Sequence, residues 1–165
     1  MGTAMTFSIC EADPSDPIHA AAIITLLDSY ASGLNGGSQG LSAEVKQNLP
    51  AALAARPTAH VFLAMNGEES AGLVISFEGF STFQCRPLLN IHDVVVAERY
   101  RGQGLSKCLL AAVEEMAVRL GCCKLTMEVL EGNTIAQAAY RSLGFDGYQL
   151  DPTLGKALFW EKKLG

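Results

Sequence analysis

The chain has 165 residues, of which 49% are hydrophobic and 18% charged, and its formal net charge is −5. This length and composition predict a single globular domain over residues 1–165 and exclude a disordered chain. The acidic balance argues against a nucleic-acid partner, and no apolar run reaches the ~18 residues that a membrane span needs.

Five cysteines stand at irregular positions, and none of them forms a C-x-x-C pair. Such usage predicts reduced, mostly buried thiols in a cytoplasmic protein. The first residues carry neither a basic segment nor a long apolar segment, so we expect no signal peptide, and Met5 is a second candidate for the first residue. His19 and His60 lack partners at metal-ligand spacing, and we therefore predict no metal site.

Strand-like and helix-like patterns alternate along the chain. Asp16 followed by Pro17 predicts the start of a first helix, and Ser42 predicts the start of a second, which Pro50 should break or kink. Three glycines within residues 35–40 predict a flexible loop between these helices. The expected elements in chain order are strand 6–12, helices 15–34 and 42–55, strands 60–65, 70–80 and 87–97, helix 105–120, strand 124–130, helix 133–144, and strands 148–150 and 157–164. The sequence therefore predicts a mixed sheet with helices on its faces, in the order β-α-α-β-β-β-α-β-α-β-β.

A turn with anion-binding character is predicted where a β-branched strand runs into an amphipathic helix, through the residues VVVAERYRGQGLS. Glycines let backbone amides approach an anion, and the start of a helix adds partial positive charge. A P-loop does not fit, because Gly102 and Gly104 are too close together and no glycine precedes Lys107. A dinucleotide-binding turn fits poorly, because Lys107 takes the place of its third glycine. The spacing of Arg99, Gly102 and Gly104 instead matches the pattern [Q/R]-x-x-G-x-[G/A].

Two motifs, RYRGQG after IHDVVV and NTIAQAAYRSLGF further along, resemble those of the GCN5-related N-acetyltransferase (GNAT) superfamily. The second matches the signature N-x-x-A-x-x-x-Y-x-x-x-G-F at Asn133, Ala136, Tyr140, Gly144 and Phe145. The resemblance covers residues 88–145 well, and it covers the first half of the chain only in the order of the elements. It implies an α+β fold with a central mixed, mostly antiparallel sheet of about seven strands and helices on both faces. It also implies acetyl-CoA as co-substrate and no metal.

The resemblance further implies where the cofactor and a catalytic acid lie. In this family the amides of the turn wrap the pyrophosphate of coenzyme A, and the pantetheine lies along the central strand where that strand splays from its neighbour at a bulge. Carried over to this chain, Tyr140 protonates the departing thiolate or else packs on the sheet, and a backbone amide near Val94 stabilises the oxyanion. Asn133 contacts the pantetheine or ribose, caps its helix, or does both. The implied cofactor-binding residues are Val94, Val95, Val96, Arg99, Arg101, Gly102, Gln103, Gly104, Leu105, Ser106, Asn133, Ala136 and Tyr140.

The base that takes the proton of the amine is left open between three side chains and water. Period-two alternation places His92, Val94 and Val96 on one face of the strand and Asp93 on the other. A histidine with an ordinary pKa of about 6.5 is mostly neutral at neutral pH, so His92 is a candidate base; its alternative is a hydrogen-bonded strand histidine. Asp93 is a candidate to orient a neighbour or the amine, and Glu128 is a further candidate base. In several members of the resembled family a glutamate on this strand acts as the base, and His92 and Asp93 stand where some polyamine-type acetyltransferases have Glu-Asp. The role of base therefore does not transfer directly.

We expect an enzyme that moves the acetyl group of acetyl-CoA to a primary amine by direct attack in a ternary complex. In this family the acceptor is chosen by the loop between the first two helices, here residues 31–41, and by the last hairpin, here residues 149–156 with Asp151. A small amine, polyamine or amino acid is favoured, and a protein N-terminus or lysine comes next. The apolar residues 158–160 of the last strand predict a core or homodimer contact. Two other classes stay open, namely a non-catalytic acyl-CoA-binding module and a nucleotide-binding oxidoreductase.

Overall fold

The structure is a computed structural model that describes residues 6–164, and Met5 as a first residue lies outside this range. The chain divides into two compact units, Met1–Leu130 and Glu131–Gly165. Each unit is described by itself below. The expected single domain over residues 1–165 concerns how the two units combine, and it stays a prediction.

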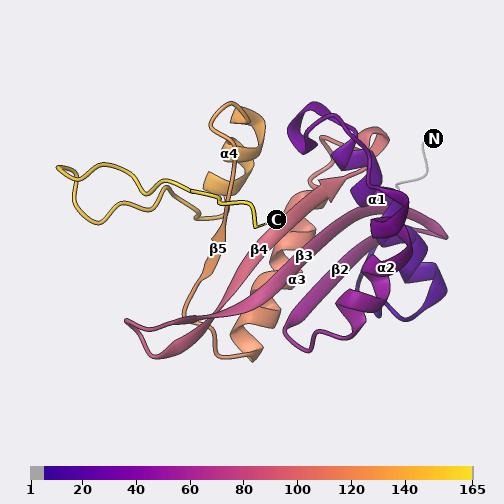
Figure 1. Ribbon diagram of the computed structural model, residues 1–165, viewed down its shortest axis with the longest axis horizontal. Coiled ribbons are helices and arrows are strands. Elements are labelled where there is room, and N and C mark those ends of the chain that lie inside the picture. The colour runs from indigo at the N-terminus through magenta and orange to yellow at the C-terminus, as the bar shows by residue number, and fades with distance from the viewer. Residues whose placement is uncertain (1–5, 165) are drawn as a thin grey trace. The chain divides into compact units, whose positions relative to one another are not determined.

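The larger unit holds a five-stranded sheet in the order β1-β2-β3-β4-β5 (Figure 1). Neighbouring strands are antiparallel, except that β5 runs parallel to β4. The elements are β1 (Ser8–Glu11), α1 (Pro17–Ala31), the 3-10 turn Leu34–Gly36, α2 (Ala43–Ala54), β2 (Ala59–Asn66), β3 (Glu69–Ser81), β4 (Arg86–Val96), the 3-10 turn Glu98–Tyr100, α3 (Leu105–Arg119) and β5 (Leu125–Met127). The expected α+β class with a mixed, mostly antiparallel sheet is confirmed.

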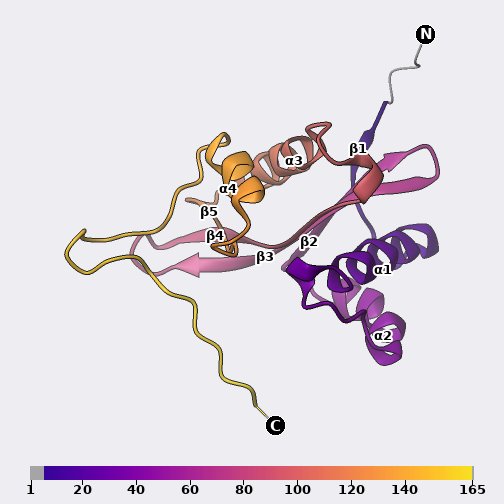
Figure 2. The same ribbon diagram turned by 90° about the horizontal axis from the view of Figure 1, so that it is seen from above.

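Helices cover both faces of this sheet, with α1 and α2 on one face and α3 on the other (Figure 2). The core on the first face includes Ile23, Leu63, Leu73 and Val95. On the second face α3 packs on β2, β3 and β4. Its buried residues recur at steps of helical period, as in the amphipathic helix that the sequence predicts here, although Cys108 is exposed. The buried residues are Leu105, Leu109, Leu110, Val113, Met116 and Ala117.

The predicted helix starts are confirmed by their capping hydrogen bonds. The Asp16 carboxylate accepts from the amides of Ile18 at 2.8 Å and His19 at 3.1 Å, and the Ser42 hydroxyl accepts from an amide of the first turn of α2. Of the expected break or kink at Pro50, the break is wrong, because α2 continues through this residue, and the kink stays a prediction. Proline removes one intrahelical hydrogen bond, but Leu53 beyond it is buried in the core and holds the second half of the helix in place.

The smaller unit contains one helix, α4 (Thr134–Arg141), in the part of the chain that the structure describes. The two last expected strands, 148–150 and 157–164, are wrong, since residues 145–164 form neither helix nor strand. A backbone hydrogen bond from Ala157 N to Tyr148 O at 3.1 Å joins the two segments. A two-stranded hairpin is marginal without a neighbouring strand, which accounts for the loss of regular pairing within this unit.

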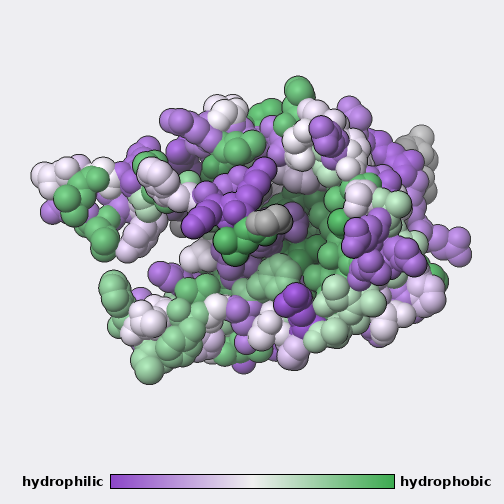
Figure 3. Space-filling model, in the orientation of Figure 1, coloured by the Kyte–Doolittle hydropathy of each residue, from purple (hydrophilic) through white to green (hydrophobic). Residues whose placement is uncertain are grey.

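Two further expectations, on the cysteines and on membrane spans, can be compared with the structure. Cys85 and Cys108 are exposed and the other three cysteines are half-buried, so the expectation of mostly buried thiols is wrong, although all five are free thiols. No helix within residues 6–164 is both long and apolar enough to cross a bilayer. Hydrophobic side chains cover the tip of the β3–β4 hairpin (Figure 3), where Phe80 and Phe83 are 59% and 94% exposed.

Candidate functional site

A β-bulge lies in the middle of β4. Ile75 of β3 pairs with Asp93, whereas the next residue, Ser76, pairs with Ile91, so His92 is an extra residue in β4. A bulge of this kind shifts the alternation of side chains by one position. This corrects the expected faces: Asp93 and Val95 lie opposite Ile75 and Leu73, which belong to the core under α1 and α2.

The bulge brings His92 and Asp93 to the same face. The His92 ring packs edge-on against Phe77 with centroids 5.6 Å apart, and Phe77 packs against the core under α1 and α2. The His92 Nδ1 atom is 3.6 Å from Asp93 Oδ2, and the two side chains are 64% and 27% exposed. Burial raises the pKa of Asp93 above its ordinary value, and His92 opposes this shift. An exposed imidazole therefore stands beside a carboxyl that is partly withdrawn from water.

One edge of β4 is open beyond the bulge. β5 pairs with β4 only at Leu89, Asn90 and Ile91, and within residues 6–164 no other strand pairs with that edge. Ala97 N donates to Ala71 O at 2.9 Å, so these two residues form a hydrogen-bonded pair. Because such pairs alternate along antiparallel strands, Val95 is also hydrogen-bonded to β3. In an antiparallel pair the residues between them direct their amides and carbonyls away from the partner strand. Val94 and Val96 therefore present their backbone groups to the open edge.

The turn after β4 carries two left-handed glycines, Gly102 and Gly104, with φ angles of 75° and 77°. A Cβ atom added at either glycine would meet no atom of the chain within 4 Å. Gly104 precedes α3 and offers no side chain to cap it, and the first helical hydrogen bonds are those from Lys107 and Cys108 to Gly104 O. The earlier amides, at Leu105 and Ser106, lack a helical acceptor. The turn thus combines free space with backbone amides at a helix start, as an anion site requires.

The two arginines of the turn differ in their contacts. The Arg101 side chain is exposed, and its Nε donates to Val96 O at 3.3 Å. The Arg99 guanidinium instead forms an ion pair with Glu69 and lies 5.1 Å from the centre of the Tyr100 ring. Gln103 donates to Arg99 O at 3.4 Å. Arg101 therefore stays beside the open edge, while Arg99 is directed toward the β2–β3 turn.

The remaining predicted site residues belong to the smaller unit. Asn133 caps α4, because its Oδ1 accepts from Ala136 N at 3.2 Å. Tyr140 lies one turn beyond Ala136 on the same helix, is half-buried, and packs against Phe145 with ring centroids 6.2 Å apart. The expected helix 133–144 ends earlier, since α4 stops at Arg141, and Gly144 follows it with a φ of 91°. Ala136 and Tyr140 are four residues apart and therefore share one face of α4.

The two segments expected to choose an acceptor contain local hydrogen bonds. In residues 31–41, Ser38 N donates to Gly33 O at 3.0 Å, and Leu41 N donates to the Asp28 carboxylate at 2.8 Å. Lys46 of α2 pairs with the same carboxylate at 2.7 Å. Asp151 in residues 149–156 accepts from the amide and hydroxyl of Thr153, and these bonds lower its pKa. Glu128 lies in the exposed segment after β5.

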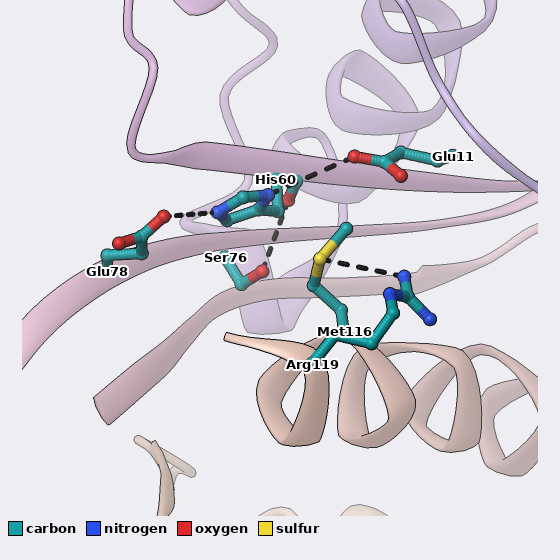
Figure 4. Close-up of polar contacts among 6 residues, drawn as sticks. All are labelled: Glu11, His60, Ser76, Glu78, Met116 and Arg119. Atoms are coloured by element: carbon teal, nitrogen blue, oxygen red, sulfur yellow. Dashed lines mark hydrogen bonds and ion pairs between the residues drawn. The ribbon is translucent and has the colours of Figure 1, made fainter. Parts of the chain in front are cut away.

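A cluster that sequence reasoning missed surrounds His60 (Figure 4). His60 Nε2 lies 2.7 Å from Glu78 Oε1, and its Nδ1 lies 4.0 Å from Glu11 Oε1. Ser76 Oγ donates to the His60 carbonyl at 3.2 Å. The partners come from β1 and β3 on either side of His60 in β2, so only the sheet register brings them together. Among residues 6–164 no three His, Cys, Asp or Glu side chains gather to hold a metal ion, and we interpret the cluster as a link between strands.

The profile of the Acetyltransferase (GNAT) family matches residues 26–145, which include the bulge, the open edge, the glycine turn and α4. The chain belongs to the GNAT family. Among curated relatives, it is 32% identical to an L-ornithine N5-acetyltransferase of Arabidopsis thaliana over 97 residues, covering 57% of this chain and 42% of that protein. It is 31% identical to a thialysine N-epsilon-acetyltransferase of Bos taurus over 86 residues, covering 50% of each. The matches thus span about half of each relative's length.

Solved structures share the GNAT fold. The crystal structure of a probable acetyltransferase aligns with a TM-score of 0.80 and 19% identity, covering 96% of this chain and 99% of that one. AAC(6′)-Iy in complex with the bisubstrate analogue CoA-S-monomethyl-acetylneamine aligns with a TM-score of 0.75 and 18% identity, covering 96% of this chain and 99% of that one. At such identities the likeness shows the fold alone.

Proposed function

We propose that this chain is an acetyl-CoA-dependent N-acetyltransferase whose acceptor is a small primary amine. One observation carries the proposal: an open strand edge, a glycine turn and a helix start follow one another within residues 94–106. Each of the three offers backbone amides, which suit a ligand that carries both amide groups and a pyrophosphate. The names of the GNAT relatives support an amine acceptor, since they include an L-ornithine and a thialysine acetyltransferase.

The glycine turn is the proposed pyrophosphate site. The amides of residues 102–106 would surround the anion, and the space beside Gly102 and Gly104 leaves room for its oxygens. Arg101 would add a positive charge, with Gln103 beside it. Val94 and Val96 are the proposed partners of the pantetheine, because their backbone groups face the open edge. Val95 is a weaker candidate, since it is buried and its backbone groups pair with β3.

Acetyl-CoA, when bound, supplies an acetyl thioester: attack by a neutral amine forms a C–N bond, breaks the C–S bond and releases a thiolate. We assign to the Val94 amide a hydrogen bond to the carbonyl oxygen as negative charge develops on it. Tyr140 would give its phenolic proton to the thiolate, since a phenol with an ordinary pKa of about 10 can protonate a thiolate whose acid has a pKa of about 8.5. Asn133 and Ala136, on the same helix, are proposed cofactor contacts.

His92 is the proposed base. Its ring is exposed, and contacts with Phe77 on one side and Asp93 on the other fix its position. Asp93 would hold the Nδ1 side of the ring and stabilise the imidazolium that forms when His92 takes the proton of the amine. Glu128 and water stay alternatives for this step.

The test is acetyl transfer to a panel of amines by the purified chain. Thiol release and mass spectrometry would follow the reaction with ornithine, thialysine, an aminoglycoside and a peptide that carries a free N-terminus and a lysine. Acetylation of a small amine is the expected result, whereas acetylation of the peptide alone would identify a protein acetyltransferase. Acetyl-CoA binding without transfer to any acceptor would identify a non-catalytic binding module and contradict the proposal.

Two further expectations belong to this proposal. Five free thiols favour a cytoplasmic setting, which fractionation of the native host would test. A homodimer is expected from the apolar residues 158–160, of which Trp160 is 83% exposed. Light scattering coupled to size exclusion would report the mass of the assembly.

A further inference from the structure

The buried ring of Tyr100 lies immediately before the glycine turn and is tied to the hairpin between β2 and β3. Tyr100 is 3% exposed, and the ring of Phe7 packs edge-on against it with centroids 5.4 Å apart. The phenol donates a hydrogen bond to the Glu69 carboxylate and accepts one from Asn66 Nδ2 at 3.1 Å. The first residue of β3 and the last residue of β2 therefore hold the side chain that precedes the turn.

Glu69 holds a second residue of the same turn. One carboxylate oxygen accepts from Tyr100 and the other pairs with the Arg99 guanidinium, which also lies over the Tyr100 ring. Both contacts are charge-assisted, and such hydrogen bonds are about twice as strong as neutral ones. The Arg99 carbonyl in turn accepts from Gln103, inside the glycine turn.

These contacts anchor the turn at its beginning. Tyr100 N donates to Ala97 O at 2.8 Å and Arg101 N donates to Glu98 O at 3.2 Å, so the chain forms a tight bend just before Gly102. At its far end the Gly104 carbonyl accepts from Lys107 N and Cys108 N, and Leu105 is 2% exposed. The contacts of Arg99 and Tyr100 therefore fix where the turn begins, and α3 fixes where it ends.

We propose that Glu69 is a positioning residue for the coenzyme A-binding turn and that Arg99 serves the turn through Glu69 rather than by contacting the pyrophosphate. The inference rests on the proposed function, because it assigns the source of order in that binding site. It predicts the direction in which the affinity for acetyl-CoA changes when the Glu69 charge is removed. A carboxylate near an anion site repels the anion, so removal of its charge tightens binding unless the carboxylate is needed to hold the turn.

Calorimetric titration with acetyl-CoA tests the direction of this change in affinity. Glu69→Gln should weaken binding about tenfold or more, the loss expected for a hydrogen bond to a charged group. The matched control is Glu68→Gln, which removes the same charge one residue earlier, at an exposed position. It should leave the affinity unchanged. Tyr100→Phe keeps the ring and removes the hydroxyl, and it should also weaken binding. Combined with Glu69→Gln, it should add less than its single effect, because the two groups share one contact.

Salt dependence separates the roles of the two arginines. Arg101→Met should flatten the dependence of acetyl-CoA affinity on salt, because it removes a charge from the anion site. Arg99→Met should weaken binding and keep the wild-type salt dependence. Thermal unfolding of each variant identifies losses that come from unfolding, and kcat at saturating acetyl-CoA should stay near the wild-type value for Glu69→Gln.

Two outcomes would overturn this inference while the proposed function stands. One is a Glu69→Gln variant that binds acetyl-CoA as tightly as the wild-type chain or more tightly. The other is an Arg99→Met variant that flattens the salt dependence as Arg101→Met does. Failure of the wild-type chain to bind acetyl-CoA would instead overturn the proposed function, and this inference with it.

Discussion

Replacing Gly104 with alanine should weaken acetyl-CoA binding far more than it weakens the fold. Gly104 has a φ of 77°, and an alanine in the left-handed region costs about 1–2 kcal/mol. For a domain of this size, 1 kcal/mol corresponds to a Tm shift of about 2–4 °C, so we expect a Tm lower by about 2–8 °C. The added methyl group meets no chain atom within 4 Å. It would instead fill the space proposed for the pyrophosphate and lower the affinity by at least about tenfold, or ~1.4 kcal/mol.

Gly121 offers a matched control for this substitution. It has a φ of 70° directly after α3, and a Cβ added there also meets no chain atom within 4 Å. Gly121→Ala should therefore lower Tm by a similar amount while acetyl-CoA affinity stays at the wild-type value. Differential scanning calorimetry and isothermal titration of both variants separate strain from binding. Equal affinities for the wild-type chain and Gly104→Ala would refute the assignment of this turn as the pyrophosphate site.

Four other changes test the catalytic roles and the core. Tyr140→Phe should lower kcat by roughly 100-fold or more with an unchanged acetyl-CoA affinity, as measured by thiol release and calorimetry. His92→Gln should move the acidic limb of the pH–rate profile. Burial raises the pKa of Asp93 above 3.8, because the folded chain disfavours the charged carboxylate. The protonated carboxyl therefore contributes fully to the free energy of unfolding below pH about 3.8, and this contribution is lost as pH rises through the raised pKa. Asp93→Asn should therefore raise Tm at pH about 7 and leave it unchanged at pH about 3. Leu109→Ala, at a side chain with 0% exposure, should cost about 2–5 kcal/mol in urea unfolding.

Contrary results would each remove one assignment. An unchanged kcat in Tyr140→Phe would exclude that phenol as the acid, and an unmoved acidic limb in His92→Gln would leave Asp93, Glu128 or water as the base. A Tm gain in Asp93→Asn that persists at low pH would show that burial of the charged carboxylate is not its source. A loss below about 1 kcal/mol in Leu109→Ala would contradict the tight packing of α3 on the sheet.

Features that depend on neighbouring residues in the sequence were predicted well. Asp16, Ser42 and Asn133 cap their helices as expected, because a cap depends on a residue and the amides two or three positions later. The glycine turn was also recognised, since its φ angles follow from residue type and its place from the strand and helix around it. The order of elements through α4 was predicted for the same reason.

Features that depend on strand register were predicted only in part. The resemblance to the GNAT superfamily implied a bulge in the central strand, but its position at His92 has no local signal. The bulge moves Asp93 to the face of His92 and directs the backbone of Val94 and Val96 to the open edge. The contact of Glu69 with Arg99 likewise joins residues 30 positions apart, which only the pairing of β3 with β4 brings together. Alternation alone therefore predicted the strand and misassigned its faces.

Calorimetric titration of the wild-type chain with acetyl-CoA, with NAD as the control ligand, tests the central claim most directly. The open edge of β4 and the glycine turn before α3 predict saturable binding of acetyl-CoA and no binding of NAD. Binding of NAD alone would contradict the account and favour a nucleotide-binding role for the turn. Binding of neither ligand would leave the turn as an ordinary loop and remove the basis for the roles of Tyr140 and His92.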